Sequence, residues 1–200
     1  MVTTTDILRV VEGRKVPAPG TWFIDPVHSE VGLTATHLVV SKVRGRLTGV
    51  AGAIVIDTVP ERSSGEVSVD ATTIETGDAK RDQHLRSPEF LDVERFPVIR
   101  FVSGSVAPMT PYTNLDVGNW QVEGDLTVRD VTRRILLELE VGGVVIDPWG
   151  KVRTGMRAWT EVDRDQFGIT WNQALEAGGF LVGKSLTVDV QIEAVRQDDA

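Results

Sequence analysis

The sequence predicts an all-β fold, an extended eight-stranded antiparallel β-barrel with a short helix-bearing insertion. Apolar and polar residues alternate with a period of two over several long segments, as is typical of strands with one buried face. One short segment has the pattern of a helix, and without alternating helices the strands are expected to pair antiparallel. Closing about eight such strands into a barrel removes both sheet edges and turns the apolar faces inward.

The alternation begins after a different N-terminal segment. Residues 1–19 end in Pro17-Ala18-Pro19 and predict a flexible arm, so residues 20–200 are expected to form one folded domain. The alternating segments lie at residues 22–24, 31–36, 66–73, 120–129, 134–141 and 185–194. Each apolar side chain buried on such a face contributes roughly 1.5–3 kcal/mol, which determines the face and the register.

The predicted helix covers Gly77–Arg86. Asp78 lies near its start and Arg86 near its end, as the helix dipole favours, and Ser87-Pro88 ends it. This helix interrupts the strand pattern and forms the predicted insertion.

The composition is that of a folded, acidic domain. Of the 200 residues, 41% are hydrophobic and 25% are charged, which argues against disorder. The net charge of −8 disfavours general affinity for nucleic acid or anionic membranes, although local basic patches remain. Because cysteine is absent, disulfides, thiolate metal sites and cysteine nucleophiles are excluded. We expect no nucleic acid partner and no cofactor.

The N-terminus lacks a basic start followed by a long apolar region, so no signal peptide is predicted. No apolar run approaches the ~20 residues that span a bilayer, so no stable membrane insertion is expected. The sequence therefore predicts a cytoplasmic location.

Motifs for chemistry are sparse. The sequence has no Gly-x-Ser-x-Gly, no Walker A loop and no His-x-x-x-His spacing, so neither a catalytic residue nor a metal ligand is assigned. His28, His37 and His84 lie in polar, turn-adjacent stretches. They either tie turns through hydrogen bonds or contact a ligand, because histidine is the usual acid–base group near neutral pH.

The arginines offer a second kind of site. Arg44, Arg46, Arg81 and Arg86 are either solvated or form a cationic rim, because guanidinium binds phosphate with two parallel hydrogen bonds. Asp163-Arg164-Asp165, in contrast, is expected to be a solvated turn or a set of ion pairs. The candidate residues for an anionic or polar head group are His28, His37, Arg44, Arg81, His84 and Arg86.

The large apolar residues either fill the interior or line a pocket, because ligand cavities are mainly hydrophobic and aromatic. The candidates for a cavity wall are Trp22, Val31, Leu33, Phe90, Phe101, Trp120, Leu126, Leu137 and Trp159.

Several short motifs together resemble the YceI-like family of lipocalin-like, polyisoprenoid-binding barrels. In chain order they are WFIDPVHS (22–29), TH (36–37), KVRGRL (42–47), TGD (76–78), RDQHLRSPEFLDV (81–93), FPVIRF (96–101), VEGDLTVRDVT (122–132) and DRDQFGI (163–169). The resemblance covers roughly residues 20–195. Leu33 and Leu47 stand where relatives commonly carry phenylalanine.

The resemblance implies a lipocalin-like barrel with a long apolar cavity for an isoprenoid lipid, and possible assembly as a homodimer. It carries over no catalytic residue. The leading hypothesis is therefore a soluble carrier or store of an isoprenoid quinone or polyprenyl pyrophosphate.

Two other hypotheses stay open. An enzyme would act on an amphipathic substrate in the same cavity, with His28, His37 or His84 paired to Asp25 or Asp82 as acid–base groups. A structural or stress-related protein would have its barrel interior filled by side chains.

Overall fold

The structure, a computed structural model, describes residues 7–109, 119–174 and 181–197. The strands are β1 (Leu8–Val11), β2 (Arg14–Pro17), β3 (Gly20–Ile24), β4 (Glu30–His37), β5 (Ser41–Leu47), β6 (Val50–Ile56), β7 (Ser64–Asp70), β8 (Val98–Pro108), β9 (Asn119–Val128), β10 (Val131–Ile146), β11 (Val152–Asp163) and β12 (Val182–Arg196). The helix is α2 (Ala79–Arg86), and the 3-10 turns are η1 (Pro60–Arg62), η2 (Ala71–Thr73) and η3 (Arg164–Phe167).

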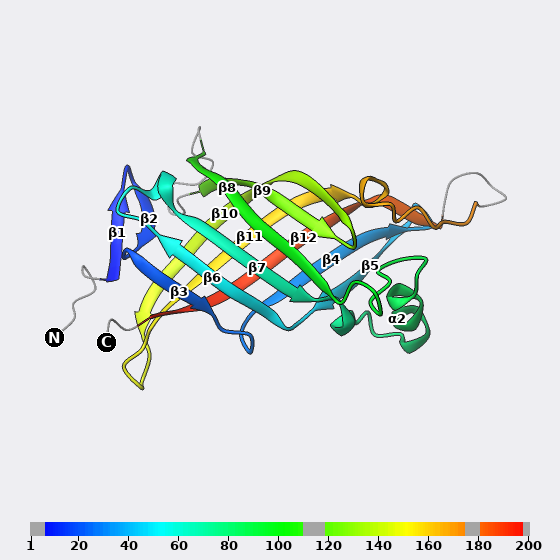
Figure 1. Cartoon of the computed structure of the whole chain (residues 1–200), viewed down its shortest axis with the longest axis horizontal. Coiled ribbons are helices and arrows are strands. Elements are labelled where there is room, and N and C mark those ends of the chain that lie inside the picture. The colour runs from blue at the N-terminus through cyan, green and yellow to red at the C-terminus, as the bar shows by residue number, and fades with distance from the viewer. Residues whose placement is uncertain (1–6, 110–118, 175–180, 198–200) are drawn as a thin grey trace.

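Strands β3 to β12 form a closed, elongated barrel (Figure 1). The strand β12 pairs with β4 over Val182–Gln191 and with β3 over Ala194–Arg196, so β3 and β4 act as one interrupted strand. In the same way β5 and β6 pair successively with β4 and β3. Pairing of β11 with β12 closes the ring, which confirms the predicted eight-stranded antiparallel barrel.

The longest strands are those in which the alternation was clearest. The strand β10 has 16 residues and β12 has 15, so each extends about 50 Å at ~3.4 Å per residue. A register shift in β10 between Val141 and Gly143 lets its far end continue in the hairpin with β11. The barrel is therefore long enough to enclose an elongated interior.

Residues 7–18 differ from the expected flexible arm. They contain the hairpin β1–β2, whose turn is Glu12-Gly13 with both residues at positive φ. Ile7 and Val16 are buried in a cluster with the barrel residue Trp22. The hairpin is ordered because it covers apolar side chains at the barrel end, and we call this end the sealed end. Residues 1–6 lie outside the described residues.

The opposite end, which we call the helix end, carries α2 and the β4–β5 turn (Figure 1). The helix is confirmed, and the side chain of Asp78 caps it by accepting a hydrogen bond from the backbone N–H of Arg81 at 2.9 Å. The buried carboxylate of Asp82 accepts hydrogen bonds from the N–H and Oγ1 of Thr76. The insertion is thus fixed by polar contacts more than by an apolar face.

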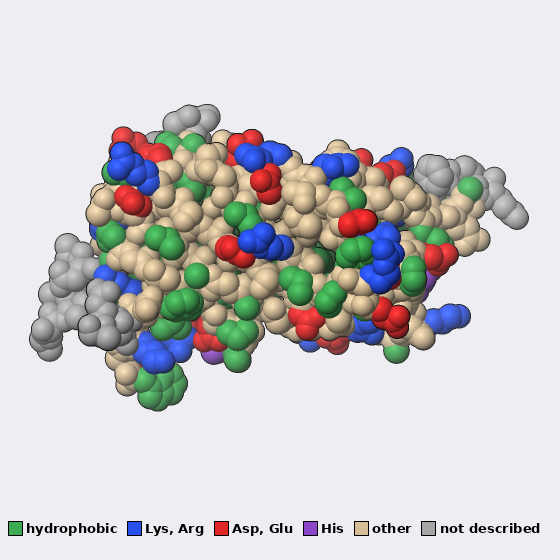
Figure 2. Space-filling view, in the orientation of Figure 1, with side chains coloured by type: hydrophobic (Ala, Val, Ile, Leu, Met, Phe, Trp, Pro, Cys, Tyr) green, Lys and Arg blue, Asp and Glu red, His purple; other side chains and the backbone are tan. Residues whose placement is uncertain are grey.

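The face of the barrel in Figure 2 carries charges of both signs, interspersed with scattered hydrophobic side chains. Cross-strand ion pairs join Arg134 to Asp125 and Arg157 to Asp189. Exposed pairs of this kind contribute at most about 1 kcal/mol each. Their main effect is to keep the outside of the barrel hydrophilic while the inside is apolar.

Candidate functional site

The barrel encloses a cavity of about 270 Å³. Alternate residues of the long strands point into it, including Leu137 and Leu139 of β10 and Val188, Val190 and Ile192 of β12. The lining of β9 runs from Trp120 to Val128, about 27 Å of strand at ~3.4 Å per residue. This empty space argues against the hypothesis that side chains fill the barrel interior entirely.

The cavity is apolar over nearly its whole surface. Its polar lining residues are Lys15, Ser63, Ser64, Ser103, Thr160 and Arg164. An apolar cavity of about 150 Å³ stays dry and binds benzene, so a larger one of the same character has room for an apolar ligand. Ligand pockets generally combine such walls with a few placed polar groups.

Six of the nine wall candidates line this cavity. They are Val31, Leu33, Phe101, Trp120, Leu126 and Leu137. All of them lie on strands whose alternation places their side chains on the inner face. The cavity therefore brings together residues that are up to about a hundred positions apart in the chain.

The other three candidates lie elsewhere. Trp22 is fully buried in the packed cluster of the sealed end, and its Nε1 donates to the carbonyl of Ala18 at 3.1 Å. Phe90 follows α2 and packs edge-on against His84. Trp159 lies on the outer face of β11, where the guanidinium of Arg157 lies 5.4 Å from its ring centroid.

The sealed end closes one mouth of the cavity with a packed core. Trp22 and Trp120 are 0% and 4% exposed, and both contact the cluster that holds Ile7 and Val16. The buried Arg14 donates from Nη2 to the carbonyl of Met109 at 2.8 Å, and its guanidinium lies 5.7 Å from the Trp120 ring centroid. At this end the cavity is therefore bordered by packed apolar side chains, together with Lys15 of β2.

Arg164 lines the cavity, whereas a solvated turn or a set of ion pairs was expected for the triplet Asp163-Arg164-Asp165. Arg164 is 3% exposed. Its Nη1 donates to the carbonyls of Ile169 at 2.8 Å and Trp171 at 2.7 Å, and its Nε donates to Gly183 at 3.1 Å. It forms no ion pair with a carboxylate of the described residues. Because the acceptors around it are neutral carbonyls, this guanidinium leaves positive charge beside a mostly apolar space.

The six head-group candidates lie outside the cavity lining formed by the described residues. Arg81 donates to Thr76, and Arg86 donates to the carbonyls of Thr72 and Ile74. These arginines tie α2 to the preceding segment. Nε2 of His84 lies 2.6 Å from Oε2 of Glu89. His37 and Arg44 lie on the β4–β5 hairpin, and His28 lies on the outer face of the barrel wall.

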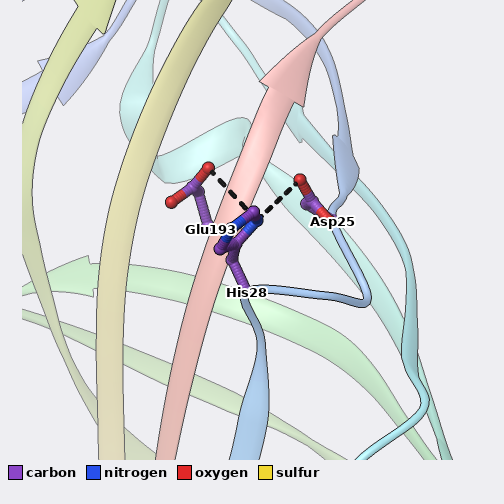
Figure 3. A group of neighbouring side chains, drawn as sticks. All are labelled: Asp25, His28 and Glu193. Carbon is purple, nitrogen blue, oxygen red and sulfur yellow. Dashed lines mark hydrogen bonds and ion pairs between the residues drawn. The ribbon is translucent and has the colours of Figure 1, made fainter.

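His28, Asp25 and Glu193 form a polar cluster on the outside of the barrel (Figure 3). Their ligand-type atoms lie within 4.8 Å of one another, with His28 Nδ1 3.1 Å from Asp25 Oδ2. Nη1 of Arg153 lies 2.7 Å from Asp25 Oδ2 and 2.7 Å from Glu193 Oε1. The guanidinium of Arg153 thus bridges the two carboxylates and occupies oxygens that a metal ion would use.

The same contacts explain the acidity of Asp25. Hydrogen bonding from Arg153, followed by that from His28, lowers the pKa of the Asp25 carboxyl to about 2. Arg153 also lowers the pKa of Asp147 on the β10–β11 hairpin. The cluster therefore fastens three segments, the β3–β4 turn, the β10–β11 hairpin and β12, rather than forming an acid–base pair that faces the cavity.

A closed antiparallel barrel around an apolar cavity defines the class of ligand-binding β-barrels. Within this class, the model of the YceI-like domain matches residues 22–194 of the chain. The chain belongs to the YceI-like family.

Relatives and solved structures agree with this assignment. A UPF0312 protein of Staphylococcus aureus is 32% identical over 173 residues, covering 85% of this chain and 92% of the relative. A UPF0312 protein of Shewanella denitrificans is 31% identical and covers 85% and 83%. The crystal structure of BcnA from Burkholderia cenocepacia has a TM-score of 0.71 at 14% identity, covering 85% of this chain and 98% of that one.

A solved polyisoprenoid-binding domain from Saccharophagus degradans has a TM-score of 0.64 at 12% identity and covers 90% of this chain and 99% of its own. At this identity the likeness concerns the fold. Within the described residues, no helix has the length and apolar character that crossing a bilayer requires.

Proposed function

We propose that this protein binds an isoprenoid lipid in its barrel and carries or stores it. The observation that supports this proposal is the elongated cavity, whose walls are aliphatic and aromatic from β9 to β12. An isoprenoid chain gains ~0.8 kcal/mol for each methylene-sized group removed from water, so a long apolar chamber favours a long apolar tail. The polar outer faces of the strands keep such a complex in water.

The similarity to a polyisoprenoid-binding domain supports the same ligand class. The domain from Saccharophagus degradans shares the barrel architecture, and the family model covers most of the chain. A tail that enters this barrel meets the same kind of wall on every strand. The ligand is accordingly proposed as an isoprenoid quinone or a polyprenyl pyrophosphate.

Arg164 supports a position for the polar head of the lipid at the helix end. The sealed end is filled by Trp22, Ile7 and Val16, whereas Arg164 lies where η3 and the start of β12 meet the cavity. A pyrophosphate head would give this guanidinium a charged partner, and a quinone carbonyl would give it a neutral acceptor. Comparing a quinone with a pyrophosphate of equal tail length therefore measures what the head contributes.

The binding proposal is tested by titrating a fluorescent polyprenyl lipid into delipidated protein and into two variants of adjacent residues. Leu137 points into the cavity, and Leu136 is 49% exposed on the outer face of the same strand. Leu137→Trp fills part of the cavity and is expected to weaken binding about tenfold, or ~1.4 kcal/mol. Leu136→Trp adds the same ring outside and is expected to leave the affinity within about twofold.

An absence of saturable binding to the folded wild-type protein would overturn the proposed function. Equal loss in the two variants would show that the lipid adheres to the outer surface. Thermal unfolding of both variants is measured in parallel, so that a loss of fold is not read as a loss of binding.

A further inference from the structure

The β4–β5 turn exposes three aliphatic residues in a row. Leu38, Val39 and Val40 are 37%, 72% and 84% exposed, and they connect His37 at the end of β4 to Ser41 at the start of β5. The turn lies at the helix end, away from the sealed end (Figure 1). We call these three residues the apolar tip.

Local backbone conformation does not explain the apolar tip. Leu38 and Val39 have φ values of 53° and 67°, a region that favours glycine and asparagine and is unusual for a β-branched residue. Hairpin turns with two positive φ values are normally built from Asn-Gly or similar pairs. The sequence here places large aliphatic side chains on a backbone that disfavours them.

Burial does not explain the apolar tip either. Neither of the two packed clusters of the barrel includes Leu38, Val39 or Val40. Backbone hydrogen bonds hold the turn, from Leu38 to the carbonyl of Leu181 at 3.0 Å and from Val40 to the carbonyl of His37 at 3.2 Å. The apolar side chains of the tip are therefore available to a partner.

Positive charge lies directly beside the apolar tip. Lys42 and Arg44 follow it on β5, both are exposed, and neither forms an ion pair with the described residues. Alternation places both side chains on the outer face of β5, while Val43 lies on the other face. Exposed aliphatic residues next to unpaired cations match the two layers of an anionic bilayer surface, the acyl boundary and the lipid phosphates.

The tip is also continuous with the cavity. The strand β4 runs from the lining residues Val31 and Leu33 directly to Leu38. The packed cluster at the sealed end, with Trp22 fully buried, favours entry and exit of the lipid at the helix end. A bilayer touching the tip would therefore lie at the same end as the exit of the cavity.

We propose that the apolar tip docks the barrel onto an anionic lipid bilayer, with Leu38, Val39 and Val40 at the acyl boundary and Lys42 and Arg44 at the phosphates. The role of this contact in lipid exchange rests on the proposed function, but the docking itself does not. Shallow, reversible contact of this kind is compatible with the overall net charge of −8, because the potential near a surface is set by the charges closest to it.

The test is flotation of the full-length protein with vesicles of phosphatidylcholine alone or mixed with phosphatidylglycerol. The main variant combines Leu38→Asn, Val39→Gly and Val40→Ser, residues that suit the backbone of this turn. It is expected to unfold at the same or a higher temperature than the wild type while binding mixed vesicles about tenfold more weakly. The variant Lys42→Glu with Arg44→Glu is expected to lose binding to the anionic vesicles and to remove its salt dependence.

The matched control is Trp149→Ser. Trp149 is 81% exposed on the β10–β11 hairpin, outside both the apolar tip and the cavity lining. This variant is expected to bind mixed vesicles like the wild type. A loss in Trp149→Ser equal to that in the tip variant would overturn the proposal, because it would show non-specific adhesion of exposed apolar residues.

Three further outcomes would also contradict docking by the tip. The first is unchanged vesicle binding in the tip variant, and the second is no vesicle binding by the wild type. The third is a wild-type dimer that the tip variant dissociates, which would assign the tip to a second copy of the chain. Lipid titration in solution separates the proposals, because tip variants are expected to keep wild-type affinity for a soluble polyprenyl probe whether or not they dock.

Discussion

The two ends of the barrel are closed by different physical means. At the sealed end, the β1–β2 hairpin packs Ile7 and Val16 onto Trp22 and Trp120, and the closure is an extension of the hydrophobic core. At the helix end, α2 buries chiefly the polar Asp82 and is held by hydrogen bonds to backbone carbonyls.

This difference gives the barrel a direction. A packed apolar closure opens only at a cost near that of unfolding, whereas a segment held by polar contacts can open locally. The apolar tip and Arg164 both lie toward the helix end, which is the end held by polar contacts. We therefore expect ligand traffic at the helix end and structural stability from the sealed end.

The largest effect is expected from Trp22→Ala. This side chain is fully buried and its Nε1 is hydrogen-bonded to Ala18, so truncation leaves a large cavity in the sealed end. The free energy of unfolding should fall by about 3–5 kcal/mol, measured by urea denaturation. A loss below about 1 kcal/mol would mean that the sealed end is not part of the core.

A smaller loss is expected when Arg153→Met removes the cation shared by Asp25, Asp147 and Glu193. The side chain of Arg153 is 19% exposed and that of Asp25 is 16% exposed. Leaving the carboxylates without this cation should therefore lower the free energy of unfolding by about 2 kcal/mol. The matched control is Arg157→Met, which breaks a single ion pair, with Asp189, that is more exposed to solvent. This variant should lose less than about 1 kcal/mol of the free energy of unfolding. Equal losses in the two variants would show that the Arg153 cluster stabilises the fold no more than an exposed ion pair does.

The pH dependence of stability tests the same cluster. The pKa of Asp25 is about 2 in the folded protein against an unfolded value near 3.8, so its stabilisation is complete above pH ~4 and is lost as the pH falls through ~2. About 1–2 kcal/mol should disappear over this window, after allowance for solvent screening. In Asp25→Asn that component of the acid transition should be missing, and an identical acid transition would contradict the assignment.

The smallest effect is expected at the helix end. Asp78→Ala removes the side chain that accepts from the N–H of Arg81, which should weaken α2 by about 1 kcal/mol. Hydrogen exchange should accelerate in α2 and stay unchanged in β9 and β10. Equal acceleration throughout the barrel would mean that the two ends open together, which would contradict local opening of the helix end.

The strands and the inner face of the cavity were predictable from alternation. Leu126 and Leu137 lie on faces where every second residue is apolar, and both line the cavity. Trp159 was assigned to the wall because of its size. Its neighbours at the same parity are Arg157 and Glu161, and this pattern places it outside.

Other features depended on contacts between distant segments. The hairpin of residues 8–17 has a Glu-Gly turn that lacks the usual asparagine, and its order comes from the barrel end that it covers. Arg164 sits in a charged triplet that is typical of a surface turn, and hydrogen bonds to backbone carbonyls, among them those of Ile169, Trp171 and Gly183, make its burial possible. Local sequence carries no signal for either.

The most direct test of lipid binding in the barrel is mass spectrometry of an organic extract from the purified, untreated protein, with the Leu137→Trp variant processed alongside. We predict an isoprenoid in near-stoichiometric amount from the wild type and a strongly reduced amount from the variant. A folded wild-type protein that yields no isoprenoid and also fails to take up a polyprenyl lipid when reloaded would contradict the account.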